Sequence, residues 1–241
     1  MKMTKRINFK DIILFENEDY IVVNKPPFIS TLDDRGLGTQ NILSLAKEYH
    51  ADSQVCHRID KETSGILVIA KNAEAYRNLA MQFEHRQVEK VYHAVVNGVH
   101  DFKGILVDLP IYTLSRGVVK IDRLRGKEAQ TIFNTIRAFK KHTLVECVPV
   151  TGRMHQIRVH LAQLEASIAG DEQYGGEPVY LSSLKKHFNL KKDTEERPVA
   201  NRFALHAWSI EFRLPNGDIL YYEAPYPKDF EVLVRQLGKY S

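Results

Sequence analysis

The sequence predicts an α+β fold built on a mixed, largely antiparallel sheet with flanking helices. Segments with the alternating or continuously apolar pattern of strands dominate the chain, and most of them are joined by short turns. Asn216-Gly217 is a strong turn signal. Segments with helical spacing are interspersed irregularly, which does not fit the regular strand–helix alternation of a doubly wound parallel sheet.

The first half of the chain is expected to contain short strands interrupted by two helices. Pro26 and Pro27 end the second strand, because proline cannot donate to a strand ladder. Thr39 can cap the first helix. The strands are expected over residues 12–15, 20–24, 66–70 and 89–97, and the helices over residues 41–48 and 73–84.

The second half repeats this mixture of strands and helices. A strand pair is expected over residues 128–139 and 143–150, and a hairpin over residues 203–214 and 218–223. Helices are expected over residues 154–164 and 228–237, with a weaker one over residues 180–192. No stretch resembles a linker, so we expect a single domain over residues 1–241 with a short N-terminal extension, residues 1–11.

Composition excludes several classes of protein. The 241 residues are 44% apolar and 27% charged, which fits a globular domain rather than a disordered chain or a coiled coil. The longest apolar run, residues 66–70, is far shorter than the roughly 20 residues of a membrane-spanning helix. The basic start has no apolar stretch after it, so no signal peptide is expected. Two distant cysteines favour a reducing, cytoplasmic location.

Positive charge is concentrated in the middle of the chain. Residues 112–160 hold ten Lys or Arg and three Asp or Glu, whereas the whole chain has a net charge of only +4. This asymmetry indicates a surface that faces a polyanion. The alternative is a solvated face that happens to be rich in lysine.

The common cofactor and metal motifs are missing from the sequence. It has no phosphate-binding glycine loop, so no nucleotide cofactor is expected. His155 and His160 would stand about 140° apart around a helix axis, so they would not share a metal ion. We therefore predict neither a cofactor nor a metal site.

Polar residues 57–65 directly precede the buried strand at 66–70. This placement puts His57, Arg58, Asp60 and Thr63 at the end of a sheet, where functional loops often lie. The alternative is that Asp60 organises a turn with Thr63 and Ser64.

A second polar cluster spans residues 151–161. Thr151-Gly152 would open a helix whose unpaired N–H groups bind phosphate together with Arg153. Arg158 lies beside the inward stripe that contains Leu161, and no acidic residue stands three or four positions away. A half-buried arginine therefore needs a carboxylate from elsewhere, for which Asp60 is a candidate. The alternative is an arginine that extends to solvent.

The third cluster is the alternating strand at residues 89–97. Tyr92 shares an apolar face with Ala94 and Val96, and it is either a catalytic tyrosine or a plain core tyrosine.

Together the three clusters resemble the RluA family of RNA pseudouridine synthases. H-R-I-D-K-E-T-S-G at 57–65 is similar to the family's H-R-L-D-x-x-T-S-G. G-R-M-H-Q-I-R-V-H-L at 152–161, followed by G-D-x-x-Y-G at 170–175, is similar to G-R-[ST]-H-Q-I-R-V-H-L…G-D-x-x-Y-G. K-V-Y-H-A-V-V-N-G at 90–98 and the weaker Asn24-Lys25-Pro26 and Leu205-His206-Ala207 complete the match over residues 19–215.

The resemblance implies a pseudouridine synthase catalytic domain with a central catalytic cleft and no cofactor. It implies that Asp60 is the catalytic carboxylate, which attacks the anomeric carbon or removes a ribose proton. Arg158 would pair with Asp60, and Tyr92 would stack on the target uracil and help to remove its carbon 5 proton. The substrate-binding residues implied are Arg58, which fills the space of the flipped base or holds phosphate, Arg153 along the backbone, Leu161 near the base, and His57 and Thr63.

Some features depart from the family pattern. Residues 165–168 read Glu-Ala-Ser-Ile in place of Gly-His-Pro-Ile, which alters a loop. Only about ten residues precede the first strand, so the N-terminal ribosomal-protein-like domain of many relatives is expected to be absent. Recognition then rests on the catalytic domain, including residues 101–127, whose alternative is a plain surface hairpin.

Three functions follow from these observations. The first is a monomeric, cytoplasmic pseudouridine synthase acting on structured ribosomal or transfer RNA. The second is a metal-independent RNA-cleaving enzyme that uses two of His57, His155 and His160 with Lys90. The third is a non-catalytic RNA-binding or ribosome-assembly factor on the same fold.

Overall fold

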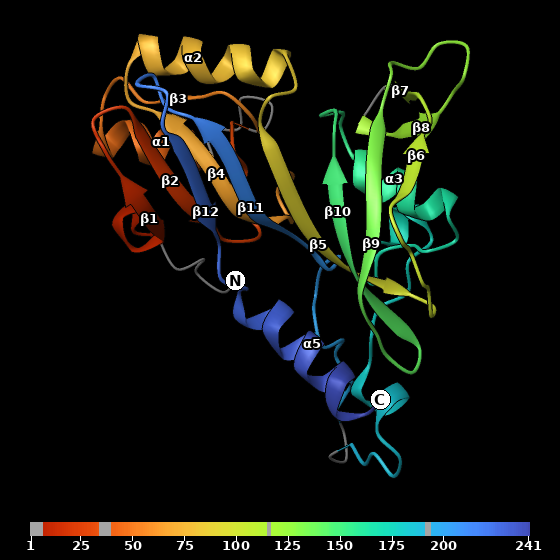
Figure 1. Ribbon diagram of the computed structural model, residues 1–241. Helices are drawn as coiled ribbons and strands as arrows, with labels where there is room; N and C mark the ends of the chain where they lie inside the picture. Colours follow the sequence, from red (N-terminus) through yellow and green to blue (C-terminus); the bar gives the residue numbers. More distant parts are fainter. Residues whose placement is uncertain (1–6, 34–39, 115–116, 191–193) are drawn as a thin grey trace. The chain divides into compact units, whose positions relative to one another are not determined.

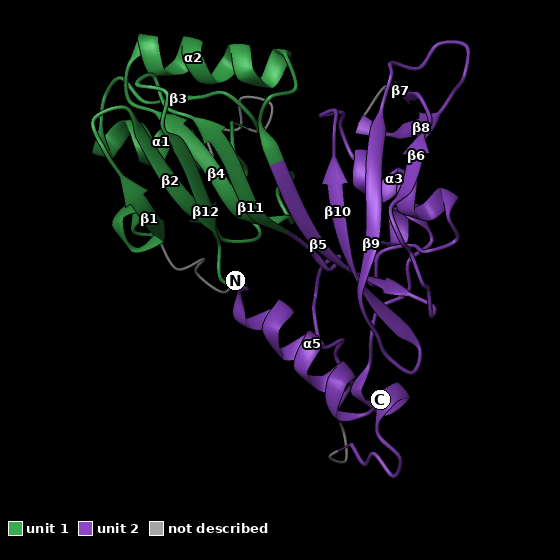
Figure 2. Cartoon of the chain, viewed as in Figure 1, with its two compact units in different colours: residues 1–89, 207–225 green, residues 90–206, 226–241 purple. Residues whose placement is uncertain are grey.

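The computed structural model describes residues 7–33, 40–114, 117–190 and 194–241. The chain divides into two compact units, residues 1–89 with 207–225 and residues 90–206 with 226–241 (Figure 2). Two strands, β5 (Glu89–Asn97) and β11 (Leu205–Arg213), each run from one unit into the other. The single domain over residues 1–241 stays a prediction, as does the extension over residues 1–11, of which residues 1–6 lie outside the described part.

The first unit is a sheet with a helix on each face (Figure 1). Its central strands, β2 (Tyr20–Lys25) and β4 (Ser64–Ala70), are nearly continuously apolar because both of their faces are covered. Ile21 and Ile69 pack with α1 (Ile42–Tyr49). Tyr20 points to the opposite face, where its hydroxyl donates to the Ala75 carbonyl of α2 (Ala73–Glu84). The remaining elements are η1 (Phe9–Ile12), β1 (Ile13–Glu16), β3 (Gln54–Val55) and β12 (Ile219–Glu223).

The second unit is built on the antiparallel strands β5, β10 (His142–Pro149), β9 (Gln130–Ala138) and β6 (Ile105–Asp108). Its core joins Val95 and Val145 of the sheet to Leu161 of α3 (Gln156–Gln163) and Phe230 of α5 (Lys228–Lys239). A separate hairpin is formed by β7 (Ile111–Thr113) and β8 (Val119–Ile121). The short helices η3 (Glu172–Tyr174) and α4 (Leu181–Leu184) complete the unit.

The strand order of the main sheet is β1-β2-β4-β11-β5-β10-β9-β6, with β12 beside β11 and β3 beside β4. The pairs β1–β2, β2–β4, β3–β4, β11–β12, β5–β10, β9–β10 and β6–β9 are antiparallel. The predicted α+β class with a largely antiparallel sheet is therefore confirmed. No helix among the described residues is long and apolar enough to cross a membrane.

Several predicted elements have different ends in the structure. The expected helix at 154–164 begins only at Gln156, because His155 adopts a left-handed conformation with φ 54°. The expected helix at 180–192 is reduced to α4, and its last two residues lie outside the described part. Thr39 also lies outside it, and the cap of α1 is Asn41, whose side chain accepts from the Ser44 N–H.

Candidate active site

Asp60 lies in the first unit, on the turn that leads into β4. The Thr63 N–H donates to the Asp60 carbonyl at 3.1 Å, so the backbone turn expected at this position is present. Thr63 is buried, Asp60 is half-buried and Arg58 is exposed. The turn therefore presents a carboxylate with partial access to solvent beside an exposed guanidinium.

Buried side chains hold the Asp60 turn in place through hydrogen bonds to its backbone. The Thr31 hydroxyl donates to the Ile59 carbonyl at 3.0 Å. Lys25, at the end of β2, is fully buried and donates from Nζ to the carbonyls of Pro26, Ile29 and Lys61 at 2.9–3.2 Å. A buried ammonium is tolerated because it is hydrogen-bonded. Lys25 thereby ties the residue after Asp60 to the sheet.

Gly65 and His57 fix the two ends of the same loop. Gly65 has φ 109°, and a β-carbon there would lie 2.1 Å from the Ala207 carbonyl oxygen, so only glycine allows this approach. His57 accepts from the Val68 N–H at Nε2 and stacks on Phe83, with ring centroids 4.8 Å apart. Through these contacts His57 is attached to β4 and α2, the elements that support the loop.

Tyr92 and Leu161 lie in the second unit. Tyr92 is half-buried on β5 opposite Cys147 of β10, and it packs against the unit's apolar core as its alternation with Ala94 and Val96 predicts. Leu161 of α3 is fully buried in that core.

Arg158 is buried and pairs with Asp171, a carboxylate outside the helix, in keeping with the expectation that no local acid serves it. Nε and Nη2 of Arg158 each donate to Asp171 at 2.7 Å, a bidentate pair. The guanidinium also lies over the rings of Tyr174 and Phe203, at 4.8 and 4.3 Å from their centroids. Asp60 belongs to the other unit, so its pairing with Arg158 stays a prediction.

Asp171 is the partner of Arg158 that the residue spacing did not identify. It is buried, and its own backbone is fixed by the turn around it, since its carbonyl accepts from the N–H groups of Tyr174 and Gly176. A β-carbon on Gly176 would lie 1.9 Å from the Ile168 carbonyl oxygen. The available signal was a Gly-Asp pair at 170–171 downstream of a buried arginine that had no local acid.

Gln156 and His160 attach α3 to β9. Gln156 donates to the Gln130 carbonyl and the Thr131 hydroxyl, and its Oε1 accepts from the Thr151 hydroxyl. His160 Nε2 contacts the Leu109 carbonyl and Nδ1 contacts the Thr131 hydroxyl, each at 2.9 Å. These partners assign the neutral tautomer with the proton on Nε2. Burial lowers the pKa of His160, in keeping with a neutral ring.

The expected phosphate site at Thr151-Gly152 differs in the structure. The helix starts later, and the Arg153 N–H is already used by Gln156 Oε1 at 3.0 Å. The Arg153 side chain is exposed, and its Nε donates to the Glu128 carbonyl. What this segment offers to a phosphate is therefore the guanidinium of Arg153 rather than a helix N-terminus.

The histidines of the RNA-cleaving alternative are held by structural partners. His155 Nδ1 contacts the Tyr174 hydroxyl at 2.8 Å, and His57 and His160 have the contacts given above. Burial lowers the pKa of Lys90, the fourth residue of that alternative, to about 8. Among the residues described, no cluster of three or more metal-ligating side chains occurs.

Comparison with known proteins defines an enzyme that modifies RNA. A family model described as RNA pseudouridylate synthase matches residues 19–163. Ribosomal large subunit pseudouridine synthase C of Buchnera aphidicola is 34% identical over 89% of this chain and 67% of its own length. Synthase D of Zymomonas mobilis is 35% identical over 93% of this chain and 72% of its own length. The chain thus spans about two thirds of the length of such relatives.

A solved structure supports the same assignment. Human RNA pseudouridylate synthase domain containing 4 superposes with a TM-score of 0.74 and 27% identity, over 95% of this chain and 94% of that one. The chain belongs to the RluA family of RNA pseudouridine synthases, isomerases that convert uridine to pseudouridine in RNA.

Proposed function

We propose that this chain isomerises uridine in large-subunit ribosomal RNA, as a cytoplasmic monomer and without a cofactor, with Asp60 as its catalytic carboxylate. The RNA class is supported by the names of relatives such as synthases C and D. The role of Asp60 is supported by its half-buried position on a turn that Lys25, Thr31 and Gly65 hold rigid. Catalytic groups gain from such fixed geometry.

The reaction exchanges one bond of the uracil for another. The bond from ribose carbon 1 to nitrogen 1 breaks, the base turns, and ribose carbon 1 bonds to carbon 5. The proton of carbon 5 is lost and nitrogen 1 gains one, so substrate and product are isomers. An ionised Asp60 serves this sequence either as the nucleophile at ribose carbon 1 or as the base that removes a ribose proton.

The second unit is proposed to supply the base-binding wall and the counter-charge. Tyr92 stacks on the flipped uracil and helps to remove its carbon 5 proton, with Leu161 behind it. Arg158 is proposed to keep Asp60 ionised. Arg158 is held in place by the rings of Tyr174 and Phe203 and by Asp171. This supports the role, because a guanidinium that is already fixed loses little entropy when it pairs with Asp60.

The remaining predicted residues divide into two groups. Arg58 and Arg153 are exposed cations that can bind the phosphates of the RNA backbone or fill the space left by the flipped base. His57 and Thr63 have contacts that support an indirect role, namely holding the Asp60 turn in place.

Residues 122–125 are proposed to grip the RNA near the target. Asp122 organises this turn by accepting from the N–H groups of Leu124 and Arg125 and from the Arg125 side chain. Arg125 lies over the Tyr112 ring at 4.6 Å, and Leu124 is 96% exposed. A rigid turn that presents an apolar tip between Arg123 and Arg125 is suited to wedge between bases while the cations hold phosphates.

The test of this function is tritium release from RNA labelled at carbon 5 of uridine. We expect wild type to release tritium from large-subunit ribosomal RNA transcripts and Asp60→Asn to lose at least 1,000-fold in rate, the size of effect of removing an essential catalytic group (~10³ or more). Asp52→Asn, an exposed aspartate of the same unit, is the matched control and keeps full activity.

Two other results would contradict the proposal. Full tritium release by Asp60→Asn would remove the carboxylate from the mechanism, whereas strand cleavage without tritium release would favour the RNA-cleaving alternative. Release from transfer RNA transcripts alone would overturn the ribosomal substrate while leaving the isomerase in place.

A further inference from the structure

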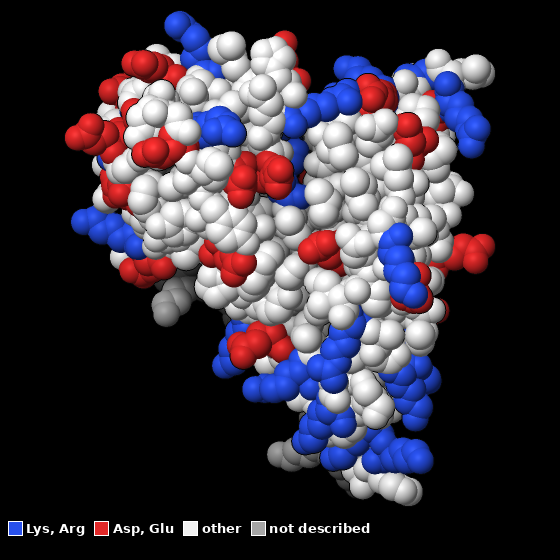
Figure 3. All heavy atoms as spheres, viewed as in Figure 1, with Lys and Arg blue, Asp and Glu red and all other residues white. Residues whose placement is uncertain are grey.

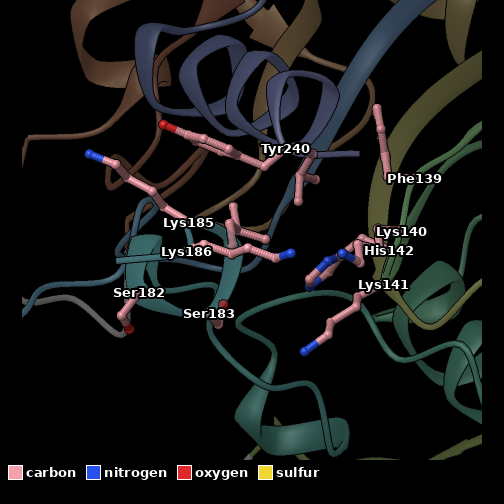
Figure 4. A pocket seen from close by; sticks show the side chains of 11 residues that line it. Phe139, Lys140, Lys141, His142, Ser182, Ser183, Lys185, Lys186 and Tyr240 are labelled. Atoms are coloured by element: carbon pink, nitrogen blue, oxygen red, sulfur yellow. The ribbon is translucent and has the colours of Figure 1, made fainter. Parts of the chain in front are cut away.

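A second basic site lies in the same unit as Tyr92, at the opposite end of the strand pair. On β5 and β10, Tyr92 is opposite Cys147, whereas Asn97 is opposite His142. Five residues of strand separate these ends, which is about 17 Å. At the His142 end, the β9–β10 turn, α4 and the end of α5 enclose a cavity of about 180 Å³ (Figure 4). Its lining consists of Phe139, Lys140, Lys141, His142, Ser182, Ser183, Leu184, Lys185, Lys186, Leu237 and Tyr240.

The charge of this cavity is strongly positive. Lys140, Lys141, Lys185 and Lys186 are all exposed, and none of the eleven described lining residues is acidic. Among the described residues, one carboxylate forms a hydrogen bond with a residue of the lining. It is Glu196, whose Oε1 accepts from the Ser182 N–H. Figure 3 shows Lys and Arg side chains gathered over this end of the second unit, where α5 ends.

A buried polar atom at the same place has no described partner. His142 is 7% exposed, and its Nδ1 makes no hydrogen bond within the described residues. Burial and the charge of Lys141 lower the pKa of His142. Leaving a buried ring nitrogen unpaired costs stability, so the position needs an explanation, and a bound group that pairs with it is one.

The size of the cavity restricts the ligand. Pockets for small molecules measure roughly 300–1,000 Å³, so a cavity of about 180 Å³ is too small for a whole nucleotide. It suits a single phosphate group whose chain continues outside. Lysines are point charges that bind phosphates without reading sequence.

We propose that the basic pocket formed by Lys140, Lys141, Lys185 and Lys186 around His142 binds a backbone phosphate of the substrate RNA, away from the target uridine. The proposal rests on the RNA substrate of the proposed function. Its consequence is that a long RNA engages both the catalytic residues and the basic pocket, whereas a short hairpin that carries the target uridine engages the catalytic residues alone.

The experiment compares two variants with the same change in net charge. The pocket variant replaces Lys140, Lys141, Lys185 and Lys186 with glutamine, and the control variant replaces Lys10, Lys47, Lys103 and Lys228, which are also exposed. Dissociation constants are measured by fluorescence anisotropy at several salt concentrations, for a long ribosomal fragment and for a short hairpin. Tritium release from the short hairpin reports catalysis independently.

We expect the pocket variant to bind the long fragment about tenfold more weakly than the control variant does. The slope of the logarithm of its binding constant against the logarithm of salt concentration should become shallower by about 0.7–0.9 for each phosphate that the lysines no longer neutralise. Both variants should bind the short hairpin equally and release tritium from it at the same rate. Equal affinities of the two variants for the long fragment would overturn the basic pocket. Absence of release by wild type would instead overturn the proposed function, so the two failures are distinct.

Discussion

At the scale of single residues, Arg158 and Asp171 form a buried ion pair in the second unit. Both side chains are almost fully buried and joined by two hydrogen bonds of 2.7 Å. Two charges removed from water depend on each other, so removing one leaves the other uncompensated at a cost of about 3–5 kcal/mol. The same pair orients the guanidinium that we propose to serve Asp60.

Asp171→Asn is therefore expected to reduce both stability and turnover. The free energy of unfolding in urea, followed by far-UV circular dichroism, should fall by about 3 kcal/mol or more. Turnover should fall more than RNA affinity, because Asp171 positions Arg158 and does not contact RNA in the proposed mechanism. Asp101→Asn breaks the exposed pair with Lys103 and should change stability by less than about 1 kcal/mol. Equal, small effects of the two substitutions would contradict the buried pair.

The partner of Arg158 also shows where sequence reasoning stops at this scale. Absence of an acid at neighbouring helical positions predicted a distant carboxylate, and that inference holds. The pairing with Asp171 depends on the turn around Asp171 and Gly176, and that turn is fixed by backbone approaches which no residue spacing reveals. Gly65 is a similar case. A glycine is required there because the Ala207 carbonyl approaches it closely, and Ala207 lies on a strand more than a hundred residues later in the sequence.

At the scale of elements, strong local signals were sufficient for some segments. Helix α2 and strand β5 have the predicted bounds, since Asn72 caps the one and strict alternation marks the other. Strands β6, β7 and β8 were not individually predicted, because they are short and their exposed residues give no period. The segment at 180–192 contains helix-forming lysines and leucines, but only four of its residues form α4.

The turn at residues 122–125 gives an element-scale prediction. Leu124→Ser removes the apolar tip and leaves Asp122 and Arg125 to keep the turn. We expect RNA affinity to fall by about 1–2 kcal/mol, because fully burying a leucine side chain is worth roughly 1.5–3 kcal/mol, with an unchanged melting temperature. Val99→Ser, a change at another exposed apolar residue of the same unit, is the control. If both variants bind RNA like wild type, residues 122–125 form a plain surface hairpin.

The start of α5 gives a prediction on pH. Burial raises the pKa of Asp229, but the hydrogen bonds and charge of Arg202 outweigh it and hold that pKa below its usual value. A lowered carboxyl pKa in the folded state contributes stability above the unfolded value of about 4, and this is lost as pH falls through the folded value. The stability difference between wild type and Asp229→Asn should therefore be full at pH 7 and shrink below about pH 4. A difference that is constant with pH would contradict the pairing.

At the scale of the whole molecule, the division into two units was not visible in the sequence. The boundaries fall at residues 89–90, 206–207 and 225–226, and the first two lie inside β5 and β11. Apolar alternation continues through a strand whether or not a boundary crosses it, so neither composition nor a linker marks the division. Because two strands cross the boundaries, the division also raises the question whether the two units unfold together.

Because β5 and β11 pass uninterrupted between the units, we predict that both units unfold in a single cooperative transition. Trp208, the sole tryptophan of the sequence, reports on the first unit, and the fully buried Cys147 reports on the second. In a Cys56→Ser background, tryptophan fluorescence and pulsed thiol labelling of Cys147 should give the same urea midpoint. Labelling of Cys147 at lower urea than the fluorescence change, or the reverse, would show two independently stable domains. The coincidence of midpoints is informative because the two probes sense different units.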